Sequence, residues 1–230
     1  DRLLYGHSDA AHLIAPLAIA TTLGRGRPAQ PLAAPFVLGL NGNAITFSPA
    51  LADAVGAPVG ALGDPRTIGA ALAAAAAGGR RLRFGVVHRY SSHNYMLRYW
   101  LAASGIHPGL YTAQDSTGTT GADVLLSVTP PPQMPATLEA GTIHGYCVGE
   151  PWNQQALVRG IGVPVTTDYD IWKDNPEKVF GVTRAWADKY PNTHVRVVKA
   201  LIRAAHWLDA NDNANRAEAV KILARPSYVG

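Results

Sequence analysis

The alternation of strand-like and helix-like segments is the feature that most constrains this chain of 230 residues. Short apolar runs predict strands at residues 35–47, 82–87, 124–128, 143–148 and 179–183. Helix-like segments separate these runs, and the longest, at residues 192–211, repeats apolar side chains at helical spacing, which predicts one stripe facing a core. Such alternation is typical of a mostly parallel sheet with crossover helices. We therefore expect an α/β fold.

Two interruptions indicate how the chain is divided. Residues 56–64 are rich in Gly and Pro, and residues 168–176 form a polar stretch before another strand-like run. If both flank crossings between lobes, residues 84–178 form one lobe, and residues 1–83 with 179–230 form the other. Two lobes joined in this way enclose a ligand cleft and can hinge.

Composition and charge narrow the function classes. Hydrophobic residues make up 47% and charged residues 16% of the chain, which is typical of a globular protein with a large interior. No run of 18 apolar residues predicts a membrane span. The net charge is +4, but Lys and Arg are scattered, so we expect no direct nucleic-acid binding, only a mild field that attracts anions. The single cysteine, Cys147, lies in an apolar run and leaves the compartment open.

Polar residues follow several predicted strands, where ligands bind in open α/β sheets. Ser92 and His93 open a helix after the strand at 82–87, and free N–H groups at a helix start can hold an anion. Glu150 and Trp152 follow the strand at 143–148. Asn43 offers an amide donor. Each of these sites also has a structural interpretation without a ligand. Ser92 and His93 can belong to an ordinary capped helix, and Glu150 can be a capping residue with Trp152 in the core. Asn43 can belong to an Asn-Gly turn.

Signatures of catalysis and cofactor binding are missing from the sequence. It contains no phosphate-binding loop, no GxGxxG after a strand, no GxSxG elbow and no paired CxxC or HExxH. We therefore expect no catalytic residues, no cofactor and no metal site, and a binding protein in place of an enzyme.

Five motifs carry a resemblance to a known family: SHNYMLRYWLAASG at 92–105, PPPQM at 130–134, GYCVGEPWN at 145–153, PEKVFGV at 176–182 and KYPNT at 189–193. In this order they resemble the nitrate- and bicarbonate-binding proteins of ABC importers. The segments DAAHLIAPLAIATTLG at 9–24 and LNGNAI at 40–45 also resemble a related cytoplasmic nitrate/nitrite sensor.

The resemblance implies a type II periplasmic-binding-protein-like fold, truncated at both ends, with the N-terminal part of the first lobe missing. It implies a periplasmic protein that captures nitrate or nitrite for an ABC permease. The first alternative is the cytoplasmic sensor, whose partner is an RNA-binding antiterminator. A less favoured alternative is a thiamine-pyrimidine-type hydrolase of the same superfamily, with Cys147 as nucleophile.

The same resemblance implies roles for three residues. His93 matches the histidine that helps to hold the anion, and Asn43 falls where the family places a glutamine. Lys178 matches the lysine of the nitrate-binding branch, where the bicarbonate branch has a carboxylate that helps to bind calcium. A lysine pairs with the anion directly, so the resemblance implies nitrate or nitrite without a metal. The alternative for Lys178 is a solvated residue at a strand end.

Overall fold

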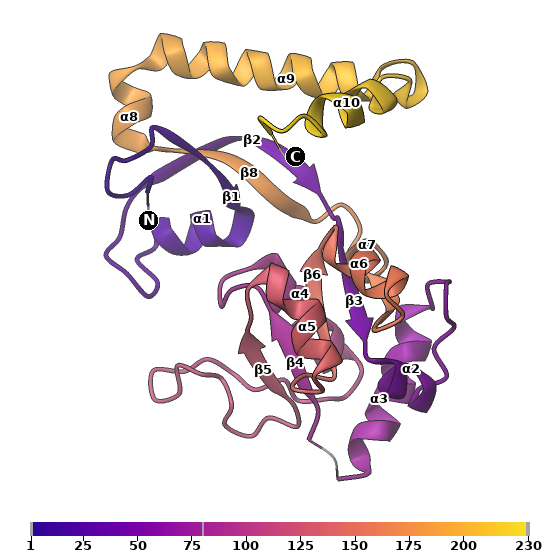
Figure 1. Cartoon of the computed structure of the whole chain (residues 1–230). Coiled ribbons are helices and arrows are strands. Elements are labelled where there is room, and N and C mark those ends of the chain that lie inside the picture. The colour runs from indigo at the N-terminus through magenta and orange to yellow at the C-terminus, as the bar shows by residue number, and fades with distance from the viewer. Residues whose placement is uncertain (1, 80, 229–230) are drawn as a thin grey trace. The chain divides into compact units, whose positions relative to one another are not determined.

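The computed structural model describes residues 2–79 and 81–228 and groups them into two compact units. The central unit contains residues 14–20 and 39–178, and the flanking unit contains residues up to 13, residues 21–38 and residues from 179 onward. Figure 1 shows the elements of each unit. In the described part of the chain, no helix combines the length and the apolar character that a membrane crossing requires.

The central unit is built on a five-stranded sheet. Its strands stand in the order β5 (Leu125–Val128), β4 (Arg83–Val86), β6 (Gly145–Gly149), β3 (Asn43–Phe47) and β7 (Val163–Thr167). Strand β4 runs parallel to β5 and β6, whereas β3 runs antiparallel to β6 and β7. Asn43 pairs with Gly149, so the first residue of β3 lies beside the last residue of β6.

Helices and short caps surround this sheet. They are α2 (Pro49–Ala54), α3 (Pro65–Ala77), α4 (Ser92–Ala103), η1 (Pro131–Gln133), α5 (Met134–Glu139), α6 (Trp152–Val158) and α7 (Asp168–Ile171), while α1 (Ala15–Thr22) contributes residues to both units. The side chains of Ser48, Asp64 and Ser91 cap α2, α3 and α4 by accepting backbone N–H groups. These N-caps fix the residue at which each of the three helices begins.

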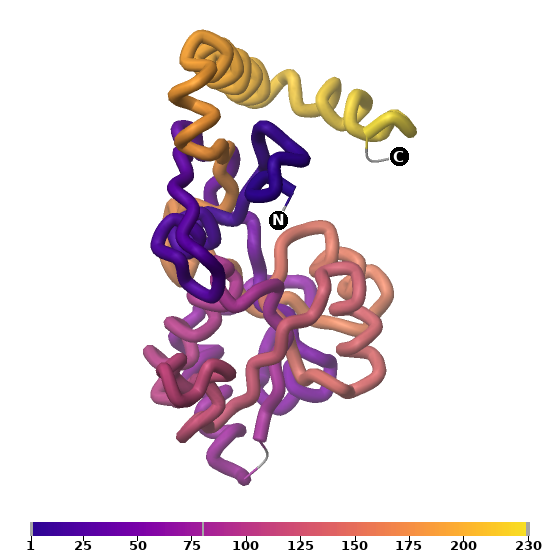
Figure 2. The backbone as a smooth tube through the Cα atoms, turned by 90° about the vertical axis from the view of Figure 1, so that its left-hand side faces the viewer, coloured from indigo at the N-terminus to yellow at the C-terminus, as the bar shows by residue number. Residues whose placement is uncertain are grey.

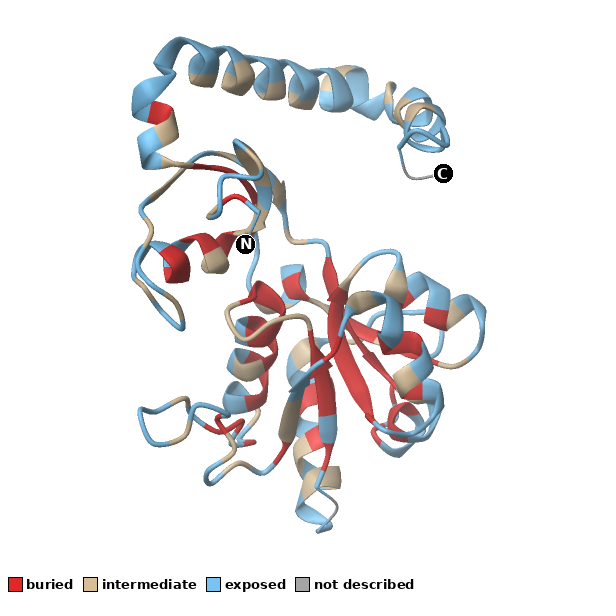
Figure 3. Ribbon diagram, turned by 60° about the vertical axis from the view of Figure 1, so that its left-hand side comes forward, coloured by how far each residue is buried: buried red, intermediate tan, exposed pale blue. Residues whose placement is uncertain are grey.

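The core of the central unit lies along β3, β4 and β6, which Figure 3 colours as buried. Phe47 is fully buried, and its ring centroid lies 5.9 Å from that of Phe84 and 6.2 Å from that of Trp100. Because the two faces of the sheet are covered, these strands hold the polar groups at their ends in a rigid frame.

The flanking unit has a three-stranded sheet in the order β1 (Ala10–Ile14), β8 (Pro176–Thr183) and β2 (Leu32–Leu40). Figure 2 traces the backbone that follows through α8 (Arg184–Lys189), α9 (Pro191–Asn213) and α10 (Arg216–Leu223). Val198 and Leu201 of α9 pack against a cluster that contains Phe180 and Val182.

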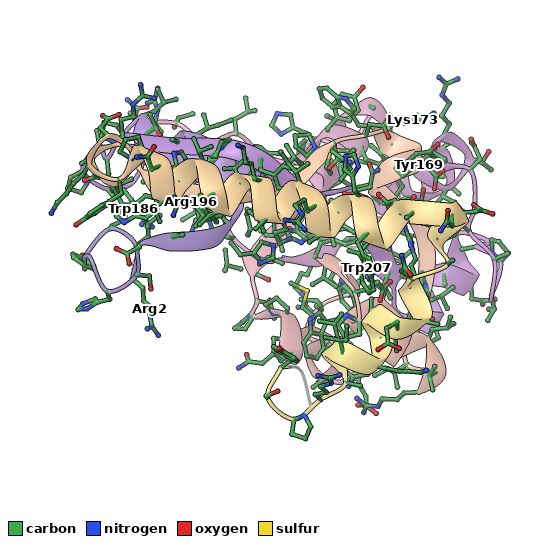
Figure 4. The ribbon with its side chains drawn as sticks, turned by 90° about the horizontal axis from the view of Figure 1, so that it is seen from above. Arg2, Tyr169, Lys173, Trp186, Arg196 and Trp207 are labelled. Atoms are coloured by element: carbon green, nitrogen blue, oxygen red, sulfur yellow. The ribbon has the colours of Figure 1, made fainter. Side chains whose placement is uncertain are left out.

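The apolar stripe predicted on the longest helix is only partly covered within the described residues. Val195 of α9 is 52% exposed and Trp207 is 41% exposed. Figure 4 looks onto α9 and labels Arg196 and Trp207. The backbone leaves helical geometry at Ala210–Asp212, so the regular helix stops before the end of the predicted segment.

Two expectations about the strands need correction. The strand predicted at residues 35–47 is two strands, β2 and β3, which belong to different sheets. Asn41 and Gly42 separate them with φ angles of 56° and 88°, and this left-handed backbone interrupts an extended ladder. Strands β1 and β7 were not predicted at all.

Residues 39–178 belong to the central unit, in which β3 lies between β6 and β7. The expected lobes, residues 84–178 and residues 1–83 with 179–230, stay a prediction.

Candidate functional site

Polar groups gather at one end of the strands of the central sheet, where β3 starts and its neighbouring strands end. Ser91, after β4, caps α4 by accepting the N–H of Asn94 at 3.1 Å. Glu150 follows β6, and Asp168 follows β7 as the first residue of α7. Because β3 is antiparallel to its neighbours, Asn43 joins this end of the sheet from a strand start.

A pocket of about 200 Å³ lies in the central unit. Four of the six predicted site residues line it: His93, Glu150, Trp152 and Lys178. The other described lining residues are Ile14, Val87, Pro131, Val148 and Gly149. A water molecule occupies roughly 30 Å³ of liquid, so the pocket has room for an ion of a few heavy atoms and some water. Drug-sized ligands need larger cavities, so the volume favours a small ligand.

Glu177 is the residue that sequence reasoning missed, and it organises the site. Its side chain is buried, and Oε2 accepts a hydrogen bond from Asn43 Nδ2 at 2.9 Å. Ser92 Oγ donates to the same oxygen, and Lys178 Nζ donates to Oε1. A buried carboxylate needs such donors because it has lost its water.

Asn43 and Ser92, which we predicted to bind the ligand, both donate to Glu177. Neither is among the residues that line the pocket, and their contact with a ligand stays a prediction. Asn43 Nδ2 also donates to Asp168 Oδ2 at 2.9 Å, and the Asn43 backbone N–H donates to Asp168 Oδ1 at 3.2 Å. The structure thus gives these two residues the role of holding carboxylates in place.

His93 lines the pocket from the first turn of α4. It is 3% exposed, and its Nε2 lies 3.5 Å from Glu177 Oε1. Burial lowers the pKa of His93 to about 4, although the negative charge of Glu177 acts in the opposite direction. The imidazole is therefore neutral near pH 7, and within the described residues its Nδ1 has no hydrogen-bond partner.

Two other buried groups feel the charge of Glu177. Burial raises the pKa of Asp168, and the charge of Glu177 adds to the effect, whereas hydrogen bonds from Asn43 oppose it. Burial also raises the pKa of the Cys147 thiol well above its usual range, with further contributions from Asp168 and Glu177. A fully buried thiol with a raised pKa is a poor nucleophile, which argues against the hydrolase alternative.

The charges at the pocket are few. Of the described lining residues, Lys178 carries the one positive charge, and its side chain is 29% exposed. Glu150 carries a negative charge, and its Oε2 accepts the N–H of Gln154 at 3.1 Å. Across the described residues, no group of three or more His, Cys, Asp or Glu side chains is arranged to hold a metal ion.

One signal in the sequence could have found Glu177. It stands directly before Lys178 at the start of a strand-like run, and an ionisable residue there that becomes buried must be paired. Its partners come from positions 43, 92 and 178, however, so the spacing of residues along the chain gave no indication of the cluster.

Comparisons with known proteins were consistent with one another. The chain matches the NMT1-like family over residues 1–224. The nitrate import ATP-binding protein NrtC of Synechocystis sp. is 41% identical over 223 residues, which is 96% of this chain and 30% of that protein. The bicarbonate transport ATP-binding protein CmpC of Synechococcus elongatus is 37% identical over 230 residues, 100% of this chain and 31% of that protein.

Binding proteins match as well. The nitrate/nitrite binding protein NrtA of Synechococcus elongatus is 33% identical over 227 residues, 97% of this chain and 47% of that protein. The crystal structure of the periplasmic nitrate-binding protein NrtA from Synechocystis PCC 6803 superposes with a TM-score of 0.78 at 29% identity, covering 96% of this chain and 52% of that one.

A more distant structure supports the fold alone. The alkanesulfonate-binding protein SsuA from Xanthomonas axonopodis pv. citri has a TM-score of 0.64 at 17% identity, covering 98% of this chain and 64% of that one. The predicted α/β fold of the periplasmic-binding-protein type is thereby confirmed. The chain spans about half the length of the nitrate-binding relatives and less than a third of the ATP-binding ones.

Proposed function

Because this chain belongs to the NMT1-like family, we propose that it is the anion-binding part of an ABC-type importer and that it captures nitrate or nitrite. The observation that carries the proposal is the small pocket in which Lys178 and His93 face the same space beside Trp152. Capture is reversible and breaks no bond. The proposed partner is a transmembrane permease, and the proposed compartment is the periplasm.

The pocket can hold an anion through charge and desolvation together. Two unit charges about 4 Å apart attract each other by about 4 kcal/mol at an effective dielectric constant near 20. Lys178 supplies the positive charge, and apolar residues such as Val87 and Val148 keep competing water away. His93, being neutral, can donate one N–H without adding charge.

The choice of nitrate or nitrite over bicarbonate rests on Lys178. The relatives include proteins named for nitrate and for bicarbonate, so their names leave the ligand of this chain open. A lysine can pair with an anion directly, whereas a carboxylate in its place would need a metal ion between itself and the anion. This reasoning supports an oxyanion that binds without calcium.

A second candidate function is favoured by the relatives of higher identity. NrtC and CmpC, at 41% and 37%, are named as ATP-binding proteins, and the chain matches 30% and 31% of their lengths. The chain would then be the anion-sensing part of an importer's ATP-binding protein. The cytoplasmic sensor that controls an RNA-binding antiterminator stays a prediction from the sequence.

Isothermal titration calorimetry tests the proposal shared by both candidates. We expect heat on adding nitrate or nitrite without calcium, and loss of that heat in Lys178→Glu. The matched control is Lys173→Glu, which changes the net charge equally: Lys173 is absent from the pocket lining, and its Nζ lies 5.6 Å from the ring centroid of Tyr169 (Figure 4).

The outcomes separate the alternatives. No heat with nitrate or nitrite, or heat with bicarbonate and calcium alone, would refute the choice of ligand. Normal nitrate binding by Lys178→Glu would remove Lys178 from the site. For the second candidate, the ATPase rate of the importer that contains this chain should respond to nitrate only while Lys178 is intact.

A further inference from the structure

Glu177 is buried and accepts hydrogen bonds from three described side chains. The described groups that face it come from five elements: Asn43 of β3, Ser92 and His93 of α4, Cys147 of β6, Asp168 of α7 and Lys178 of β8. Asn43 Nδ2 lies 2.9 Å from an oxygen of Glu177 and 2.9 Å from an oxygen of Asp168. One amide nitrogen therefore bridges two buried carboxyl groups.

The charges in this cluster do not balance. Glu177 and Asp168 are 4% and 1% exposed, and Lys178 is the one cation that contacts them among the described residues. His93 is neutral near pH 7, and the Cys147 thiol stays protonated. With both carboxyl groups ionised, the cluster carries one net negative charge before any ligand enters.

An anion entering the pocket makes this imbalance worse. It approaches Lys178, which already donates to Glu177, and so competes with that carboxylate for the same positive charge. A second uncompensated negative charge in a buried setting is costly, and the usual response of a protein is to neutralise a carboxyl group by protonation. Asp168 is the carboxyl group placed to respond, because Asn43 Nδ2 bridges it to Glu177 and burial already raises the pKa of Asp168.

We propose that Asp168, which Asn43 Nδ2 bridges to the buried carboxyl group of Glu177, takes up a proton when the anion is captured, so that this site binds an anion and a proton together. The inference rests on the proposed function, because it concerns the same pocket. Glu177 acts here as a positioning residue, since it contacts Lys178 and is not among the residues that line the pocket. The site then captures its anion more tightly in a more acidic compartment.

The sign of the pH dependence follows from linkage. The anion raises the pKa of Asp168 further, so the bound state holds more protons than the free state. Affinity therefore increases as the pH falls through the pKa of the bound state and levels off below the pKa of the free state. With one proton fully coupled, affinity changes by about tenfold per pH unit within that range.

Calorimetry with nitrate measures the proton directly. Titrations of the wild-type protein at one pH, in MES and in imidazole buffer, should give different heats because the buffer supplies the proton. Affinities measured between about pH 5 and pH 7.5 should rise toward acid. Glu177→Gln removes the negative charge that competes with the anion for Lys178 and that raises the pKa of Asp168, so its affinity at high pH should approach the wild-type value at low pH and stay flat.

A matched pair on α7 provides the control. Asp168→Asn should abolish the buffer-dependent heat, whereas Asp170→Asn should leave it unchanged, because Asp170 is exposed and binds Thr167. If Glu177→Gln fails to fold, the wild-type titrations and this pair still decide the question.

Each result has one meaning. Nitrate binding with equal heats in both buffers and a flat pH profile would overturn proton uptake and leave the proposed function standing. Equal loss of proton uptake in Asp168→Asn and Asp170→Asn would overturn the assignment to Asp168. No binding of nitrate or nitrite at any pH would refute the proposed function and this inference with it.

Discussion

The buried amide of Asn43 offers a stringent test of the site's architecture. Its Nδ2 donates to Asp168 and to Glu177, both at 2.9 Å, and its own side chain is nearly inaccessible. Replacing Asn43 with Ala removes both hydrogen bonds and leaves two buried carboxyl groups short of a donor. A hydrogen bond to a charged group contributes about 1.5–3 kcal/mol, so we expect Asn43→Ala to lower the free energy of unfolding by about 4 kcal/mol at pH 7.

The loss should shrink as the pH falls. Hydrogen bonds from Asn43 lower the pKa of Asp168 against the larger raising effect of burial. Without them the folded-state pKa of Asp168 rises further above its unfolded value. A group with a raised folded pKa stabilises the protein below its unfolded pKa and loses that contribution as the pH rises through the folded pKa. Between about pH 4 and pH 7, the free energy of unfolding of the variant therefore decreases with rising pH more than that of the wild type.

Urea unfolding followed by circular dichroism, at pH 7 and at pH 5, measures both effects. The midpoint should fall while the denaturant slope stays constant, because the surface exposed on unfolding is unchanged. Asn192→Ala, at an exposed position in the first turn of α9, is the control and should change the free energy of unfolding by less than about 0.5 kcal/mol. A loss below about 1 kcal/mol for Asn43→Ala, or one that grows toward acid, would refute the reasoning.

Three further predictions concern the central unit. Phe47→Ala should lower the free energy of unfolding by about 3–5 kcal/mol because it empties the middle of the core, whereas Val158→Ala, at a position 85% exposed, should have almost no effect in the same urea titration. Ser91→Ala should cost about 1 kcal/mol by removing the cap that accepts from Asn94, and an unchanged unfolding midpoint would contradict that role. Cys147 should resist iodoacetamide in the native protein and react only after unfolding, as followed by mass spectrometry; rapid native labelling would revive the hydrolase alternative.

Local sequence rules located most of the helices and strands. Capping residues and apolar spacing set the starts of helices such as α4 and α8 to within a residue or two. Strands β4, β5 and β6 were also predicted, because each is a short apolar run between polar segments. The α/β fold and the gathering of polar groups at the carboxyl ends of strands followed from the same local signals.

Partners distant in the sequence could not be predicted in this way. The prediction merged β2 and β3 into one strand because both are apolar. In the structure, Asn41 and Gly42 adopt left-handed backbone angles between them, and the two strands belong to different sheets. The pairing of β3 with β6 and β7 could not be predicted for the same reason, because it joins segments that are far apart in the sequence.

Capping, spacing and apolar runs act over a few residues, so the sequence predicted that polar side chains gather where the strands end. What those side chains contact depends on how the chain packs. The tertiary structure brought His93 and Lys178 to one pocket and turned Asn43 and Ser92 toward Glu177. The reason is that burial creates the requirement: a carboxylate that loses its water must find donors, and which donors are near depends on how distant segments pack.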